Sequence, residues 1–489
     1  MLTMAVCFLP RGRWAKQLAL ALLPLMLLGI GSPRARGQCN NNANNNANNN
    51  ANNNNNNNNN NLNNVNGGLL VPFVQTRQVG GMLIEPGGVL QNVEVDLRND
   101  LRQQRLLALQ AVPADLNAPT ELRKVSLRKL EAAIAQHLKD GRGPLPDEIR
   151  YLGGLQRVRY VFVYPEQGDL VLAGPGEGWK VNDAGEVVGA TSGRPVLQLE
   201  DLLVALRTAS PTSGEVISCS IEPTEEGRRR LEALRLSTIG NPTQTLTLME
   251  QQLGPQKILV TGVPDTSRFA QVLVSADYRM KRIAMKFDAS PVKGLPSYLD
   301  MASPAAASQT PRWWMTTNYE PLLKDPEGLA WELRGKGVKA MTEEDVFVDG
   351  VRQQSSGKAN SQAQKWADLM TENFEELAAR DTIFGELRNC MDLAIVAALI
   401  TRENLSEKAG YSMPLLLNQG ELAVARYEAP KTVHSMASAV KKRRTWIISV
   451  SGGVELDSFG VAGRQEVDPA IDAVRAKAFK SKVDGWWWN

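Results

Sequence analysis

The sequence predicts a mixed α+β fold in two globular domains, preceded by an export signal and a polar linker. Segments that alternate β-branched or aromatic residues with other residues, such as 157–164, predict strands. Segments with apolar residues three and four positions apart, such as 266–287, predict helices. Both kinds of segment are interspersed along residues 67–489, a length that fits two domains.

Residues 1–37 have the three parts of a signal peptide. A basic start precedes the apolar run Leu18–Ile30, and the small residues Ala35 and Gly37 suit a signal peptidase. The alternative is an uncleaved anchor, but a spanning helix needs about 20 apolar residues. This run is shorter and is interrupted by Pro24. We therefore expect cleavage, which would leave no transmembrane helix.

Residues 38–66 are an asparagine-rich linker. Asparagine side chains are short and polar, so ordering them would cost conformational entropy without burying apolar surface. We expect a disordered spacer between the cleavage site and the folded part of the chain. Together, the signal and the spacer predict an exported bacterial protein of the periplasm, the cell envelope or the extracellular space.

The charge balance gives no support for a nucleic-acid partner. Five of the 55 Lys and Arg residues lie in residues 1–37, which contain no Asp or Glu. The mature chain would therefore carry 50 basic and 52 acidic residues, a net charge of −2. Such a chain has no electrostatic reason to bind nucleic acid or anionic lipid strongly.

The first expected domain, residues 67–209, combines helices with β-hairpins. The segment Arg157–Tyr164 reads as a strand, and Pro165–Gly168 turns the chain back into a second strand. In chain order the pattern predicts helices at 101–109 and 122–138, strands at 157–164 and 169–173, a small hairpin at 180–189 and a helix at 199–207.

The second expected domain covers residues 210–455, and residues 456–489 should form a C-terminal helix and a tryptophan-rich tail. The apolar run Leu393–Ile400 is too short to span a membrane, so we expect it in the core. In chain order the pattern predicts a strand at 215–221, helices at 224–236 and 246–253, a strand at 257–263, a helix at 266–287, strands at 313–319 and 329–338, helices at 362–379 and 383–401, and strands at 415–417, 421–427 and 445–450.

Several sequence strings follow one another along this second part, and their combination in this order is specific. They include VTGVPDTSRFAQVLVSADYRMKRIAMKF, RWWMTTNYEPL and ELRNCMDLAIVAALI. Over about residues 210–451 the chain resembles an uncharacterised family of exported bacterial proteins, known only as a domain of unknown function. The resemblance implies a shared fold and an envelope setting. It implies no activity, cofactor or catalytic residue.

The residues that carry common catalytic chemistry are scarce. The chain has two histidines, His137 and His434, and no Cys-x-x-Cys pair, so we expect neither a metal site nor a cofactor. His137 lies near the end of an expected helix, where an imidazole interacts well with the helix dipole. Export would permit a disulfide between Cys219 and Cys390, but their spacing does not decide whether it forms.

Carboxylate chemistry needs no rare residue and therefore stays open. Two Asp or Glu side chains at a suitable separation can cleave a glycosidic bond. The candidates are Glu343, Glu344 and Asp345, or Asp277 and Asp300 beside the aromatic strings.

Aromatic residues gather on two expected strands. Flat rings can stack on sugars, but alternating Trp and Tyr residues on strands more often pack the core. The residues concerned are Trp313, Trp314, Tyr319 and Trp331.

Two further groups are candidates for binding. Arg279 and Arg282 lie on one helix face and could bind an anionic envelope polymer, although a solvated helix face is the simpler interpretation. The end of the chain, Trp486–Trp488, either docks on its own domain or engages a partner or a membrane interface.

Two hypotheses remain for the function. The first is a non-catalytic envelope protein that binds envelope polymer or envelope proteins through the aromatic and basic residues. The second is a secreted hydrolase that acts on envelope glycans with Asp and Glu. The asparagine-rich linker, the scarcity of histidine and the absence of catalytic motifs such as Gly-x-Ser-x-Gly favour the first hypothesis.

Overall fold

The structure is a computed structural model, and it describes most of the chain after residue 73. The described residues are 74–75, 82–92, 103–210, 216–233, 241–301, 311–353, 361–440, 445–447, 451–480 and 485–489, apart from gaps at 86, 104–105, 108, 142, 345 and 349–350. The expected signal peptide (1–37) and asparagine-rich linker (38–66) lie outside them. The chain divides into residues 1–67 and one compact unit, residues 68–489.

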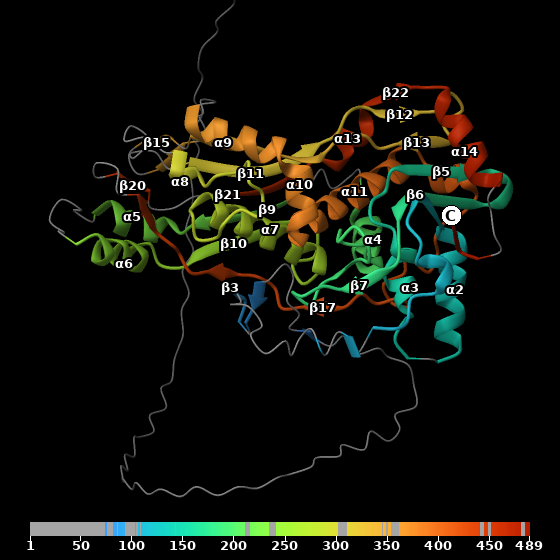
Figure 1. Ribbon diagram of the computed structural model, residues 1–489, viewed down its shortest axis with the longest axis horizontal. Helices are drawn as coiled ribbons and strands as arrows, with labels where there is room; N and C mark the ends of the chain where they lie inside the picture. The colour runs from blue at the N-terminus through green and yellow to red at the C-terminus, as the bar shows by residue number, and fades with distance from the viewer. Residues whose placement is uncertain are drawn as a thin grey trace, which may run out of the picture. The chain divides into compact units, whose positions relative to one another are not determined.

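The compact unit has the predicted α+β composition, with two large sheets among helices (Figure 1). The eight-stranded sheet has the order β14-β11-β21-β9-β10-β18-β3-β2. The bounds of its strands are β2 Met82–Ile84, β3 Val89–Asn92, β9 Ile217–Pro223, β10 Gln256–Thr261, β11 Pro311–Asn318, β14 Gly337–Glu344, β18 Thr432–Val433 and β21 Ser451–Leu456.

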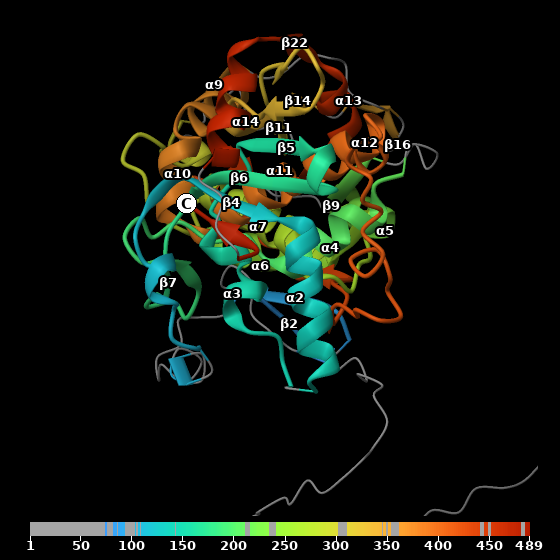
Figure 2. The ribbon, with the colours of Figure 1, turned by 90° about the vertical axis from the view of Figure 1, so that its right-hand side faces the viewer.

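The second large sheet has seven strands in the order β22-β12-β13-β5-β6-β4-β23 (Figure 2). Its strands come from residues before and after the domain boundary that was expected at residue 210. The two expected domains therefore share one continuous hydrogen-bonded sheet. The bounds are β4 Thr120–Ser126, β5 Tyr160–Tyr164, β6 Asp169–Gly176, β12 Leu322–Lys324, β13 Ala330–Glu332, β22 Gln465–Val467 and β23 Trp487–Trp488.

The helix expected at residues 122–138 is only partly correct. Residues up to Ser126 form strand β4, which pairs with β6, and helix α2 begins afterwards at Leu127–Lys139. The Ser126 side chain accepts a hydrogen bond from the Lys129 backbone N–H, which is the N-cap geometry that starts a helix. Within residues 122–138, the helical spacing of apolar residues therefore applies only from Leu127 onward.

Helix α7, Arg268–Ala284, covers one face of the eight-stranded sheet, where it packs against β9 and β21. Ser267 caps it by accepting from the Ala270 N–H at 3.1 Å. Its apolar face, which includes Phe269, Val272 and Met280, is fully buried, as the 3–4 spacing predicted.

Helix α11, Thr382–Arg402, is buried over most of its length and contacts α4 (Leu199–Thr208), α7 and α10 (Phe374–Arg380). The helix expected at 362–379 is divided at Asn373 into α9 (Ser361–Glu372) and α10. Within the described part of the chain, no helix is both long enough and apolar enough to cross a membrane.

The remaining elements are short or peripheral. Residues 415–417, expected as a strand, form a turn, and of 421–427 only β17 is extended. The other helices are α3 Asp147–Arg150, α5 Glu225–Ala233, α6 Pro242–Leu253, α8 Tyr298–Met301, α12 Leu405–Ala409, α13 Ser458–Gly463 and α14 Ala470–Lys480, and the other strands are β1 Val74–Gln75, β7 Trp179–Val181, β8 Val187–Gly189, β15 Val346–Val348, β16 Val351–Gln353, β17 Arg426–Tyr427, β19 Ser438–Val440 and β20 Thr445–Ile447.

The C-terminal tryptophans dock on the chain's own fold, which was one of the two alternatives. Strand β23 pairs antiparallel with β4, and the Ser126 N–H donates to the Trp486 carbonyl at 2.8 Å. Trp488 is 1% exposed, and its Nε1 donates to the Ala478 carbonyl at 3.1 Å. The tail therefore forms the edge of the seven-stranded sheet.

Candidate anion-binding site

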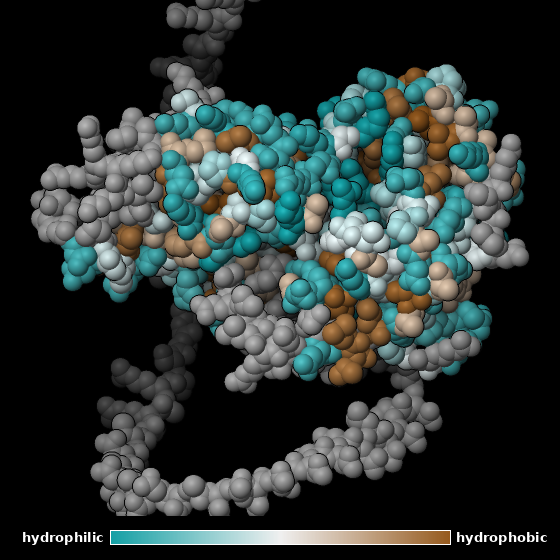
Figure 3. All heavy atoms as spheres, viewed as in Figure 1, coloured by the Kyte–Doolittle hydropathy of each residue, from teal (hydrophilic) through white to brown (hydrophobic). Residues whose placement is uncertain are grey.

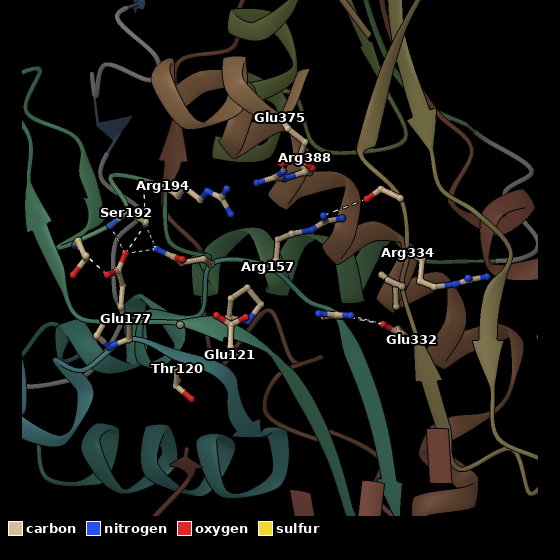
Figure 4. A pocket seen from close by; sticks show the side chains of 18 residues that line it. Thr120, Glu121, Arg157, Glu177, Ser192, Arg194, Glu332, Arg334, Glu375 and Arg388 are labelled. Carbon is tan, nitrogen blue, oxygen red and sulfur yellow. Dashed lines mark hydrogen bonds and ion pairs between the residues drawn. The ribbon is translucent and has the colours of Figure 1, made fainter. Parts of the chain in front are cut away.

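A cavity of about 560 Å³ lies where the seven-stranded sheet meets helices α10 and α11 (Figure 4). Its size is within the range of small-molecule sites. Five arginines and four glutamates are among the residues that line it. The lining residues are Pro119, Thr120, Glu121, Gln156, Arg157, Arg159, Pro175, Gly176, Glu177, Thr191, Ser192, Arg194, Glu332, Leu333, Arg334, Gly335, Glu375 and Arg388.

Arg388 brings a buried positive charge from α11 to this cavity. It is 2% exposed, and its Nη1 donates to Glu375 Oε2 at 2.9 Å. Its buried Nε has no hydrogen-bond partner among the described residues. Burial, followed by the charge of Arg157, lowers the pKa of Arg388 below its ordinary value. The site therefore holds a cation whose hydrogen-bonding capacity is only partly used.

Arg157 lies beside it and is held by α11 and the loop between β13 and β14. Its Nε and Nη2 donate to the two oxygens of Asp392 at 3.0 and 3.3 Å, and Nη1 donates to the Gly335 carbonyl at 3.3 Å. Burial opposes the charged form, but Asp392 outweighs it and raises the pKa of Arg157. Arg157 is therefore a fixed cation in the wall of the cavity.

The backbone at Gly335 is suited to this role. Its φ is +108°, and a Cβ there would lie 2.7 Å from the Asn318 carbonyl oxygen. Glycine therefore allows the close approach that presents the Gly335 carbonyl to Arg157.

Arg194 approaches from the loop that follows β8. It is half-buried, and no described residue holds its guanidinium by a hydrogen bond or an ion pair. Figure 4 shows the side chains of Arg157, Arg194 and Arg388 turned toward the same space, whereas Arg334 points away from it. Arg334 instead pairs with Glu320 at 3.1 Å.

Most carboxylates in the lining already have partners. Glu177 accepts from the Ser192 N–H at 2.9 Å, the Thr191 N–H at 3.0 Å and Gln156 Nε2 at 2.7 Å. Burial opposes its charge, but the hydrogen bonds of Ser192 and Thr191 lower the pKa of Glu177. A carboxylate stabilised in this way is a poor proton donor near neutral pH.

Two other acids are bound to arginines. Glu332 accepts from Arg159 Nε at 3.0 Å and from the Tyr160 hydroxyl at 3.2 Å. Glu375 accepts from Arg388, as described above. These acids balance part of the arginine charge and offer no pair of free carboxylates for hydrolysis.

A tight turn places Gln156 beside Glu177. Gly154 has a φ of +76°, and a Cβ there would lie 1.9 Å from the Glu177 carbonyl oxygen. Only glycine fits this approach, which sets Gln156 and Glu177 in the same wall.

Trp313 and Trp331, both expected as candidate sugar-stacking residues, are 0% exposed. The Trp313 ring packs on Tyr298 and Trp366, with centroid distances of 4.7 and 4.9 Å. Since neither tryptophan offers a face to a ligand, the packing alternative holds for both.

The other two aromatic candidates have different surroundings. Trp314 is half-buried on β11, with the Arg312 guanidinium 5.6 Å from its ring. Tyr319 is buried, and its hydroxyl donates to Asp392 Oδ1 at 2.5 Å. Tyr319 therefore supports Arg157 from behind the cavity without lining it.

The predicted basic pair, Arg279 and Arg282, is held by ion pairs within the fold. Both guanidinium groups bind Asp288, and Arg279 Nε also donates to Asp381 at 2.8 Å. These contacts tie α7 to the segments that flank it, so the two side chains are not an open basic stripe.

On the face shown in Figure 3, hydrophilic and hydrophobic residues are interspersed.

The carboxylates proposed for hydrolysis do not form a described pair. Asp277 is buried and accepts from Lys281 Nζ at 2.7 Å, while Asp300 accepts from Lys286 and from the Ser297 hydroxyl. Glu343 is half-buried on β14. Asp345 and the Glu344 side chain lie outside the described residues.

No cysteine or histidine is among the described residues that line the cavity. Cys219 and Cys390 are both free and buried, and burial raises the pKa of each thiol. His137 is near the end of α2, where its Nε2 lies 3.1 Å from the Gly143 carbonyl oxygen. Among the described residues, no group of three His, Cys, Asp or Glu side chains could hold a metal ion.

Sequence reasoning missed the arginines of the cavity because they are far apart in the chain. Arg157 and Arg194 belong to no motif, and Arg388 lies in the string ELRNCMDLAIVAALI, whose family resemblance implies no role for it. One signal was present: Arg388 and Asp392 stand at positions of a core helix that is mostly apolar. Charged residues buried in a core helix need partners, and such positions are often functional.

Comparison with known proteins concerns a different part of the chain. No curated protein and no solved structure matches this sequence. The lining residues of the cavity all fall outside the one segment with a family match. Residues 219–298, from β9 to α8, match the family described as "Protein of unknown function (DUF1598)", which confirms the resemblance to a domain of unknown function over that segment.

Proposed function

We propose that this is an exported cell-envelope protein that binds an anionic ligand in the arginine-lined cavity without altering it chemically. The observation that carries the proposal is that Arg157, Arg194 and the buried Arg388 converge on one cavity, where the Arg388 Nε is unpaired among the described residues. A buried charged donor without a partner is costly, and an oxyanion would satisfy it.

The carboxylates of the cavity support binding over catalysis. Glu177, Glu332 and Glu375 are each committed to hydrogen bonds or ion pairs. General acid catalysis needs a carboxyl that holds its proton near the working pH. The pKa of Glu177 is shifted in the opposite direction.

The location remains part of the proposal. It rests on the three-part signal in residues 1–37 and the asparagine-rich tract at 38–66. The partner would be an anionic group of an envelope polymer.

Envelopes from the protein's own cells provide the test. The chain from Gln38 onward should sediment with them, and Arg388→Gln should weaken this retention at least tenfold. Arg334→Gln is the matched control, because it removes one arginine of the same lining that points away from the cavity.

Mass spectrometry of the supernatant separates this proposal from the hydrolase hypothesis. We expect no soluble fragments to accumulate over time. Release that depends on the protein would establish a hydrolase instead.

A further inference from the structure

We infer that the ligand is a hydroxylated acid of sugar size, with one carboxylate or phosphate on a hydroxyl-rich body. This inference rests on the proposed function, because it uses the same cavity. It specifies what kind of anion the cavity accepts.

The anionic group would meet Arg388, with Arg194 and Arg157 nearby. The Arg388 Nε is buried and unpaired among the described residues, and its Nη1 is held by Glu375, so the orientation of the guanidinium is set. Guanidinium groups match carboxylate and phosphate oxygens through paired N–H donors. A bound oxyanion would also relieve the repulsion between Arg388 and Arg157.

The lining limits how much negative charge fits. Five arginines and four glutamates line the cavity, and the buried Asp392 neutralises Arg157 from behind. A ligand with several negative charges would be repelled by Glu121 and by the glutamates that already bind arginines. The five arginines are matched in number by the four glutamates and Asp392, so the site can accept no more than the single oxyanion that its local arginine cluster binds.

The rest of the lining fits hydroxyl groups. Its neutral polar side chains are those of Thr120, Gln156, Thr191 and Ser192, of which Gln156 and Ser192 also hydrogen-bond Glu177. Hydroxyl and amide groups can both donate and accept hydrogen bonds. Sugar hydroxyls need this combination. The cavity volume, about 560 Å³, leaves room for such a body beside the anionic group.

The same lining disfavours two other kinds of acid. No aromatic side chain is among the described lining residues, so a nucleotide base would have no ring to stack on. The larger apolar side chains there are Leu333, Pro119 and Pro175, too few to cover an alkyl chain. A nucleotide or a fatty acid is therefore a poor fit.

Isothermal titration of the chain from Gln38 onward tests the inference with defined probes. The sugar acids are glucuronate and glucose 6-phosphate, whose comparison also separates carboxylate from phosphate. The controls are glucose, hexanoate, acetate, inorganic phosphate and adenosine monophosphate. We expect at least one sugar acid to bind tenfold more tightly than every control.

Substitutions test separately the residues that would bind the anionic group and those that would bind the hydroxyl groups. Arg388→Gln should abolish sugar-acid binding, and Arg334→Gln should leave it within twofold. Because Arg388 is buried, Arg194→Gln on the half-buried loop provides a second test that does not disturb the core, and it should weaken binding at least fivefold. Thr120→Val should weaken the sugar acid at least threefold and leave acetate unchanged.

The outcomes distinguish the two proposals. If acetate, phosphate and hexanoate bind as tightly as the sugar acids, the anion site stands and the hydroxylated ligand is wrong. If no anion binds, or if Arg334→Gln weakens binding as much as Arg194→Gln and Arg388→Gln, the proposed function itself fails.

Discussion

Asp392 on α11 accepts two hydrogen bonds from Arg157, at 3.0 and 3.3 Å, and so joins this buried helix to the segment that leads into β5. The Asp392 side chain is fully buried, and that of Arg157 is 18% exposed. The pair therefore sets the wall of the cavity and contributes to the packing of two distant parts of the chain.

Asp392→Asn should lower the free energy of unfolding by about 3–5 kcal/mol, because it leaves the Arg157 charge buried without its counter-charge. Urea unfolding of the purified chain measures this. Tyr319→Phe removes only the hydrogen bond to Asp392 and should cost about 1–3 kcal/mol. Equal effects of the two substitutions would contradict the role given to the ion pair.

Asp201 should make stability depend on pH below neutrality. It lies in a buried cluster with Arg268 and Glu386. Burial, despite the opposing charge of Arg268, raises the pKa of Asp201 to about 7. The folded state therefore holds a proton that the unfolded chain, with a pKa of about 3.9, releases.

The contribution of Asp201 is fully present below about pH 4 and is lost as the pH rises to about 7. Urea midpoints between pH 4 and 8 should therefore decline less steeply in Asp201→Asn than in the native chain. Parallel curves for the two proteins would exclude this role for Asp201.

Trp488 should anchor the C-terminal strand. It is buried, with its Nε1 bonded to the Ala478 carbonyl, so Trp488→Ala should cost about 3–5 kcal/mol. Trp314→Ala is the control, because this tryptophan is half-buried, and it should cost less. A Trp488→Ala protein as stable as the native chain would mean that the tail is not docked in solution.

Cys219 and Cys390 should resist alkylation in the folded protein. Both are free and buried, and burial raises the pKa of both thiols, so the reactive thiolate is scarce. Peptide mapping after iodoacetamide treatment should find both residues modified only when urea is present. A disulfide between them in the native protein would contradict the structure.

The export prediction can be tested at its cleavage site. Mass spectrometry of the protein from its own cells should find Gln38 at the N-terminus. Leu22→Arg places a charge in the apolar run, so the uncleaved precursor should accumulate in the cytoplasm. Normal processing of this variant would contradict a signal peptide.

The pattern of apolar and polar residues along the chain predicted most elements correctly where neighbouring residues in the sequence decide the local structure. The hairpin of β5 and β6, helix α7 and helix α11 lie where alternation and helical spacing placed them. The helix expected at 122–138 was wrong for residues 122–126, because pairing with β6 overrides helix spacing there. Residues 415–417 failed for a related reason: the Leu415 and Leu416 N–H groups donate to buried Glu131 and to no strand.

The sequence by itself determined the α+β class, the main helices and the apolar residues that would be buried, because these depend on the order of side chains along a short stretch. Only the tertiary structure decided that Trp313 and Trp331 are core residues, that the C-terminal tail completes a sheet, and that Arg157, Arg194 and Arg388 share one cavity. The physical reason is that burial and charge pairing depend on residues far apart in the chain. Arg388 meets Arg157 only when α11 packs beside the seven-stranded sheet.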